Sequence, residues 1–225
     1  MTSFDTQRRE ICRVGRSLFQ RGLVHASAGN ISVRLPDTQG FLITPTDACL
    51  GFLEPDQLAH ALVDADAPDP TPAGPRASKT LALHRAIYAA EPLAQCVIHS
   101  HSTHLVALTL AGVWRTDAIL PPLTPYFVMK VGRMPLIPYH RPGDPALAQA
   151  LATVIESARA AGAPIRAVML ERLGPNVWHE SPAAAMAALE ELEETARLWL
   201  LSGRQAAPLS SAQLDELHGA FGVRW

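Results

Sequence analysis

An apolar run that ends in two closely spaced histidines constrains the fold of this chain more than any other feature. Residues 95–104 read Gln-Cys-Val-Ile-His-Ser-His-Ser-Thr-His, which predicts a buried strand ending at His99 and His101. Alternate side chains of a strand leave the same face, so both imidazoles can reach one metal ion. A divalent cation there would polarise a carbonyl or carry a water. The alternative is that one histidine is exposed and the other is hydrogen-bonded in a turn.

The size and composition indicate one globular domain over residues 1–225, of which 48% are apolar. The chain has no long uncharged apolar run and no signal-type segment at its start, so we expect a cytoplasmic protein that does not contact membranes. A net charge of −2 gives no basic stripe, which argues against nucleic acid as a partner. Cys12, Cys49 and Cys96 lie far apart and are expected to be buried free thiols.

The hydrophobic pattern predicts an α/β arrangement of short strands and amphipathic helices. Helices are expected over the first twenty residues, over 78–90, from about 103, and over 144–161, 181–201 and 211–219. Strands are expected over 31–35, 40–43, the histidine run, 165–170 and 176–178. The proline-rich residues 65–75 read as a surface loop, and 121–144 as mostly loop with a short element near 126–131. The acidic run 190–194 is expected to form a solvated or inter-subunit face.

Four ordered segments resemble the class II aldolase/adducin family. They are Ser-Ala-Gly-Asn-Ile-Ser at 27–32, Leu-Ile-Thr-Pro-Thr at 42–46, Ser-Lys-Thr-Leu-Ala-Leu-His-Arg-Ala-Ile-Tyr at 78–88 and Val-Ile-His-Ser-His-Ser at 97–102. Each motif is weak alone, but the ordered set is specific. Residues 121–129, 138–144 and 190–196 resemble more narrowly its 3-oxo-tetronate 4-phosphate decarboxylase branch, near the fuculose-phosphate aldolases. The resemblance implies a central, mainly antiparallel sheet flanked by helices, in a homo-oligomer, usually a tetramer, with active sites at subunit interfaces.

The resemblance also implies a pocket for the phosphate of a small-molecule substrate. Its candidate residues are Gly29, Asn30, Thr44, Thr46 and Ser78. Small residues let the backbone approach an anion, and a helix N-terminus favours negative charge. The alternatives are an ordinary turn at 29–30 and an ordinary helix cap at 78.

Two departures from the family pattern affect the metal and the base. Family enzymes carry a carboxylate where this chain has Thr80, and a third metal-binding histidine where it has Leu173. A catalytic zinc normally has three protein ligands, whereas His99 and His101 supply two. We hypothesise that His140 completes a divalent metal site, most simply for zinc, although the leucine puts its occupancy in doubt. The alternatives are His104, His179 and a residue of a neighbouring subunit.

The missing carboxylate favours one reaction of the family over another. Retro-aldol cleavage must remove a hydroxyl proton, so loss of the base should cost about 10²–10⁴ in rate. Loss of CO₂ from a β-keto acid instead needs an electron sink, which a weakly held metal or Lys79 would provide. Lys79 either serves in this way, contacts the phosphate, or points into solvent.

These considerations predict a lyase that acts on a phosphorylated sugar acid. Its candidate catalytic residues are Thr80, Lys79 and Tyr126, the last reaching a substrate across an interface or serving a structural role. The alternative is a catalytically degenerate homologue that acts as a binding or assembly module.

Overall fold

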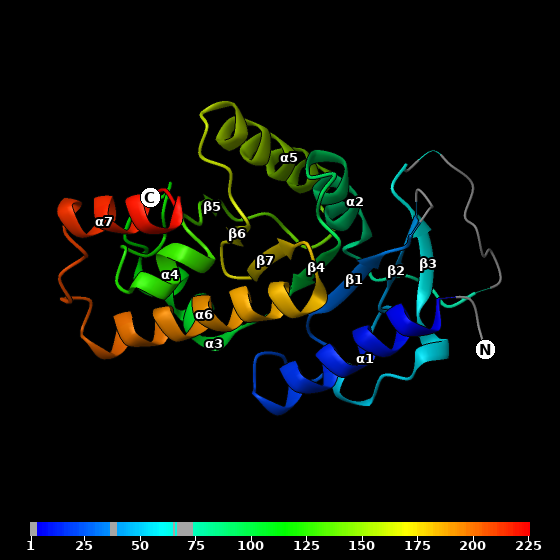
Figure 1. Ribbon diagram of the computed structural model, residues 1–225. Helices are drawn as coiled ribbons and strands as arrows, with labels where there is room; N and C mark the ends of the chain where they lie inside the picture. Colours follow the sequence, from blue (N-terminus) through cyan, green and yellow to red (C-terminus); the bar gives the residue numbers. More distant parts are fainter. Residues whose placement is uncertain (1–3, 37–39, 65, 67–73) are drawn as a thin grey trace.

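A mixed sheet with the strand order β3-β2-β1-β4-β7-β6-β5 runs through the middle of the molecule (Figure 1). The computed structural model describes residues 4–36, 40–64, 66 and 74–225. The strands are β1 Asn30–Arg34, β2 Gly40–Ile43, β3 Ala59–Leu62, β4 Cys96–His99, β5 Leu136–Ile137, β6 Ala167–Leu170 and β7 Gly174–His179. Every neighbouring pair is antiparallel except β5 and β6. The predicted α/β fold with a mainly antiparallel sheet is therefore confirmed.

Helices cover both faces of this sheet (Figure 1). They are α1 Asp5–Gln20, α2 Leu81–Ala90, α3 Thr103–Ala111, α4 Pro125–Lys130, α5 Pro145–Ala160, α6 Pro182–Leu201 and α7 Ser211–Phe221, with short 3₁₀ turns at Leu50–Phe52 and Pro55–Gln57. Helices α2 and α5 pack on one face, and α1, α3, α4 and α6 pack on the other. No helix in the described ranges is both long and apolar enough to cross a membrane.

Two hydrophobic cores follow from the alternation of side chains along the strands. Ile31 and Ile98 point into the larger core beneath α1 and α6, while Val97 and Trp178 point into the smaller core beneath α2 and α5. Each of these side chains is at most 3% exposed. A sheet buried on both faces explains why β2, β4 and β6 read as nearly continuous apolar runs rather than as alternating ones.

Most predicted elements are present, with small shifts at their ends. Helix α2 begins at Leu81 with Thr80 at its N-cap position, so Ser78 is not the cap residue that the sequence predicts. The turn between β1 and β2 and most of the loop 65–75 lie outside the described residues. Cys12 and Cys96 are buried free thiols as expected, whereas Cys49 is only partly buried.

The acidic run of α6 is not a uniformly solvated face. Glu193 is 9% exposed, and its carboxylate accepts the backbone N–H groups of His104 and Leu105 at 3.0 and 3.1 Å. These N–H groups belong to the first turn of α3, which has no side-chain cap of its own. The expectation for 190–194 is therefore wrong at Glu193, because this carboxylate satisfies the N-terminus of a neighbouring helix.

Candidate active site

A cavity of about 530 Å³ opens where β1 begins and β4 ends. Asn30 and His99 face each other in the antiparallel register of these strands, which places both at the same end of the sheet. The turn 25–29, the segments 45–47 and 78–83, and the start of α5 close the remaining sides. The lining residues include His25, Gly29, Asn30, Thr46, Ser78, Lys79, Thr80, His99, His101, Asp144, Leu147 and Leu173. This volume suits a small phosphorylated molecule.

His99 and His101 both line this cavity, although not for the reason that the sequence suggests. Their ring centroids lie 5.0 Å apart at an interplanar angle of 71°. The strand ends at His99, so His101 owes its position to the following turn rather than to strand alternation. Gly174 packs tightly behind this turn, because a Cβ added there would lie 1.9 Å from the carbonyl oxygen of Ser100. A glycine at 174 thus allows the backbone at 174 to lie close to the Ser100–His101 backbone, and this contact fixes where the His101 side chain begins.

The hydrogen bonding of His99 leaves one ring nitrogen ready to bind a ligand. Its Nδ1–H donates to the carbonyl oxygen of Pro175 at 2.9 Å, so Nε2 keeps its lone pair. A metal-ligating histidine typically donates its other N–H to such a carbonyl. Burial, together with the neighbouring His101, lowers the pKa of His99 to about 3. The ring is therefore neutral near pH 7, which is the form that coordinates a cation.

The third position of a metal site is not filled by the residue that the sequence favours. His140 does not line the cavity, and its Nδ1 lies 3.5 Å from Asp144 Oδ2. Within the part of the chain that the structure describes, no three histidine, cysteine or acidic side chains gather closely enough to hold a metal. Leu173 lines the cavity but offers no donor atom. The cavity thus offers the two imidazoles of His99 and His101, one fewer than the three protein ligands that a catalytic zinc normally has.

Two further histidines considered from the sequence lie elsewhere. His104 contacts Glu193 through Nδ1 at 2.8 Å, and His179 contacts Arg166 and Glu180. Neither lines the cavity. A histidine that sequence reasoning missed, His25, does line it, with its ring centroid 6.2 Å from that of His101. No pattern marks His25 in the sequence, because it stands alone in the turn after α1.

The segment around Gly29 and Asn30 forms one side of a candidate anion cradle. Gly29 has a φ of +83°, and an added Cβ would lie 2.7 Å from Val24 Cγ1 and 2.9 Å from the carbonyl oxygen of His99. Only glycine fits both the backbone conformation and the space. The next residue, Asn30, is 5% exposed, and its Oδ1 lies 2.5 Å from Nε2 of the buried His84.

Ser78, Thr46 and Thr80 join this cradle from a second direction. The backbone N–H of Ser78 donates to the Thr44 carbonyl at 3.2 Å, and that of Thr46 donates to the Arg76 carbonyl at 3.0 Å. These bonds hold segments 44–46 and 76–78 side by side. The Ser78 and Thr80 hydroxyls lie 3.0 Å apart at the start of α2. Small polar groups beside a helix N-terminus are suited to bind an anion.

Three predicted site residues are not part of the candidate anion cradle. Thr44 does not line the cavity, because it is 1% exposed and its Oγ1 accepts the backbone N–H of Ile31 at 3.2 Å. Lys79 lies at the rim, with Nζ 3.1 Å from Asp47 Oδ1. Tyr126 is 65% exposed on α4 and does not line this cavity.

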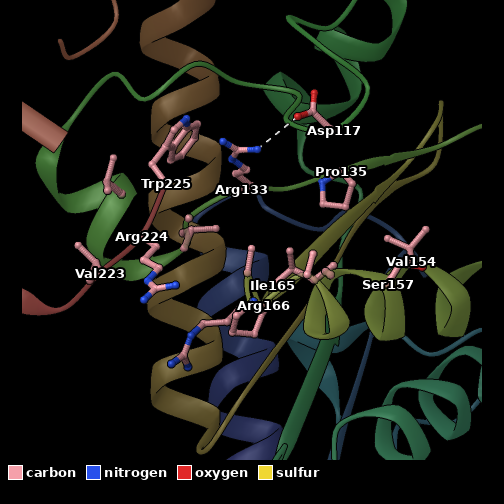
Figure 2. Close-up of a pocket in the computed structure, with 18 of the residues that line it drawn as sticks. Asp117, Arg133, Pro135, Val154, Ser157, Ile165, Arg166, Val223, Arg224 and Trp225 are labelled. Atoms are coloured by element: carbon pink, nitrogen blue, oxygen red, sulfur yellow. Dashed lines mark hydrogen bonds and ion pairs between the residues drawn. The ribbon is translucent and has the colours of Figure 1, made fainter. Parts of the chain in front are cut away.

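A larger cavity, about 740 Å³, lies between α4, α5 and the C-terminal residues (Figure 2). Figure 2 shows Arg133 directed toward Asp117, with Arg166 and Arg224 pointing away from that pair. Its lining is mainly apolar and contains no histidine or cysteine. The smaller cavity, which holds the converging imidazoles, is the better candidate for chemistry.

The fold and the cavity together define an α/β protein with a candidate anion-binding active site at the end of its sheet. Residues 9–200 match the model of the Class II Aldolase and Adducin N-terminal domain, and the chain belongs to this family. The predicted resemblance is therefore confirmed.

Individual relatives agree with this assignment. A 3-oxo-tetronate 4-phosphate decarboxylase of Cupriavidus necator is 54% identical over 100% of both chains. Among solved structures, YgbL from Escherichia coli is 39% identical with a TM-score of 0.83, covering 95% of this chain and 98% of its own. An l-fuculose-1-phosphate aldolase from Thermus thermophilus is 25% identical with a TM-score of 0.73, covering 91% and 98%. Both predicted branches of the family are thus represented.

Proposed function

We propose that this chain decarboxylates a phosphorylated 3-oxo sugar acid of the 3-oxo-tetronate 4-phosphate type. The prediction of a lyase enzyme is confirmed by membership of the family and by the full-length relative with a decarboxylase name. One observation supports this choice of reaction. A single cavity holds the two neutral imidazoles and the candidate anion cradle, but it has Thr80 where family enzymes carry the carboxylate that acts as a base.

The carboxylates of the cavity support decarboxylation over aldol cleavage. The described lining residues include two, Asp47 and Asp144. Asp47 is paired with Lys79, and Asp144 accepts the backbone N–H of Ala146 at 3.0 Å, which lowers its pKa. Neither is a free base for removing a hydroxyl proton. Breaking the bond to a leaving CO₂ requires no such base.

The apolar part of the cavity lining favours the same reaction. Leu173, Leu147 and Leu83 all line the cavity. A substrate carboxylate placed against this wall loses hydration, whereas the departing CO₂ is uncharged. The wall therefore disfavours the reactant relative to the product-like transition state.

The division of roles follows from these positions. Gly29, Asn30, Thr46 and Ser78 hold the phosphate, which orients the reacting end of the substrate toward the histidines. Nε2 of His99 and the ring of His101 would hold a divalent cation, for which zinc is our proposal. That cation, when bound, supplies a positive charge that accepts electron density at the ketone oxygen.

Release of CO₂ from 3-oxo-tetronate 4-phosphate tests the proposal directly. We expect turnover with added Zn²⁺ or Mn²⁺, a large loss with a chelator, and little activity on the unphosphorylated acid. Fuculose 1-phosphate cleavage, measured in parallel, should be slower by at least about 10²-fold because the base is missing. Absence of decarboxylation with every metal tried would reject the proposed reaction.

The single-domain organisation, a homotetramer and a cytoplasmic location belong to the same proposal. In this assembly Tyr126, whose ring is exposed on α4, would reach the cavity of a neighbouring subunit. Light scattering of the purified protein and mixing of inactive Tyr126→Phe and His99→Ala chains test the arrangement. Partial recovery of activity in the mixture is expected only if one site draws on two subunits.

The alternative considered from the sequence, a catalytically inactive assembly module, has one observation in its favour: among the described residues, no three possible metal ligands gather. Metal analysis separates the two. Stoichiometric zinc in the purified protein supports an enzyme, whereas a site that cannot be loaded supports the module.

A further inference from the structure

We propose that His84, Ser32 and Tyr88 are positioning residues that fix the Asn30 amide with its NH₂ group toward the cavity. In this arrangement the amide presents only hydrogen-bond donors to a ligand, which selects a phosphate group. This inference rests on the proposed function, because it assigns Asn30 to the phosphate cradle.

The four side chains form a continuous buried series from the core to the cavity wall. The Tyr88 hydroxyl lies 2.9 Å from Ser32 Oγ, Ser32 Oγ lies 2.7 Å from His84 Nδ1, and His84 Nε2 lies 2.5 Å from Asn30 Oδ1. Each of the four residues is at most 5% exposed. Only Asn30 of the series lines the cavity. The series therefore connects a cavity residue to groups that no ligand touches.

The donor in each bond follows from the chemistry of the groups. Asn30 Oδ1 can only accept, so the His84 Nε2–H must donate to it. Burial lowers the pKa of His84 to about 3, so the ring is neutral and its Nδ1 is an acceptor. Ser32 must then give its proton to Nδ1 and accept the hydroxyl proton of Tyr88. Each hydrogen bond in the series is therefore donated in the direction from Tyr88 in the core to Asn30 at the cavity.

The far end of the series is rigid. The Tyr88 ring packs against Phe41, with centroids 4.9 Å apart, and the Arg34 guanidinium lies 4.6 Å from the centre of the same ring. The Arg34 side chain also donates to the backbone carbonyls of Tyr88 and Ala94, both at 3.0 Å. These contacts hold the Tyr88 hydroxyl oxygen within reach of Ser32 before a ligand arrives.

This arrangement has a consequence for specificity. Because His84 holds Oδ1 and Asn30 lines the cavity, our proposal assigns Nδ2, the other half of the amide, to the cavity side. A phosphate dianion accepts hydrogen bonds from such a group, whereas a substrate hydroxyl in the same place would gain less from it. A freely rotating amide would bind either group. The buried series would thus exclude unphosphorylated substrates by holding one amide orientation.

The wild-type protein offers a test that needs no variant. Long-range ¹⁵N NMR of the imidazoles should show His84 as the neutral tautomer protonated at Nε2. Protonation at Nδ1 instead would reverse the series and overturn the proposal.

Variants test the link to the anion, with inorganic phosphate as the probe. Ser32→Ala and His84→Leu should weaken phosphate binding by about 10-fold or more, because a charge-assisted hydrogen bond loses its orientation. The same variants should raise KM for the phosphorylated substrate and leave kcat within about 3-fold, since the reacting atoms lie at the histidine end. His84→Gln, which can still donate and accept, should recover most of the affinity.

A matched control separates positioning from general loss of stability. Thr195 is fully buried in α6, and its hydroxyl has no hydrogen-bond partner among the described residues. Thr195→Val and Tyr88→Phe each remove one buried hydroxyl with little change of shape. Only the tyrosine variant should weaken phosphate binding, and equal affinities in both would overturn the proposal. If phosphate binds as expected but no CO₂ is released, the proposed reaction fails while the positioning role stands.

Discussion

The candidate site depends on a few side chains whose neighbours determine their chemical state. His99 is held neutral by burial and oriented by the Pro175 carbonyl, and Asn30 is oriented by His84. At both positions one polar atom is already hydrogen-bonded, which leaves the other, Nε2 of His99 or Nδ2 of Asn30, for the role that we propose. Changes at this scale should therefore alter ligand binding more than folding.

Replacing either imidazole that we propose as a metal ligand should strongly weaken cation binding. We expect His99→Ala and His101→Ala each to weaken zinc affinity by more than about 100-fold, since the cost of losing a ligand exceeds that of losing its supporting hydrogen bond. His140→Ala serves as the control and should retain wild-type metal content. Elemental analysis after dialysis measures the metal bound by all three variants. Loss of metal from the His140 variant would show that His140 is a metal ligand.

A carboxylate at position 30 should repel the substrate. In Asn30→Asp, one oxygen can still accept from His84, while the other faces the cavity with a negative charge. We expect KM for the phosphorylated substrate to rise by at least about 10²-fold, because a hydrogen-bond donor becomes a like charge. An unchanged KM would show that the phosphate binds elsewhere.

At the scale of elements, the helices and most strands could be predicted because buried apolar runs and helical stripes repeat at regular periods. The strands β3 and β5 were missed, because four residues that include a histidine and a strand of only two residues give too little periodic signal. The side of a helix on which one charged residue lies could not be predicted in this way. Glu193 follows Leu189 and Leu192 on the buried side of α6, but a run of acidic residues conceals that position in the sequence. Likewise, His25 reaches the cavity only through the turn after α1, for which the sequence carries no periodic signal.

The contact between α6 and α3 should contribute measurably to stability. Glu193→Ala removes the acceptor for two backbone N–H groups of α3, so we expect the free energy of unfolding to fall by about 1–3 kcal/mol. Glu194→Ala is the matched control, because its partner is the exposed Arg197 at 3.4 Å, and it should change stability by less than about 0.5 kcal/mol. Urea denaturation of both variants gives the comparison, and equal losses would contradict the capping role.

At the scale of the whole molecule, two buried neutral histidines make stability depend on pH. The pKa values of His84 and His99 are both lowered from 6.5 to about 3, chiefly by burial. The unfolded chain therefore binds more protons than the native protein between these values. The stabilisation is fully present above about pH 6.5 and is lost as the pH falls toward 3.

Urea unfolding of the metal-free protein between pH 7.5 and 5 should reveal this loss. Each histidine should contribute a slope approaching about 1.4 kcal/mol per pH unit below its ordinary pKa. His84→Gln should remove the part of the slope that His84 contributes, while His101 and His179, whose pKa values burial also lowers, still add to it. A stability that stays constant over this range would mean that the two rings are not neutral and buried.

The walls of the candidate cavity come from places as distant along the chain as His25 and Leu173. The walls of the cavity are therefore complete only when the turn before β7 has been synthesised and has packed against the earlier segments. Substrate bound there opposes wholesale unfolding rather than local fraying. A ligand that binds only the folded cavity would then lengthen the lifetime of the protein against proteases by the factor 1 + L/Kd, where L is the free ligand concentration.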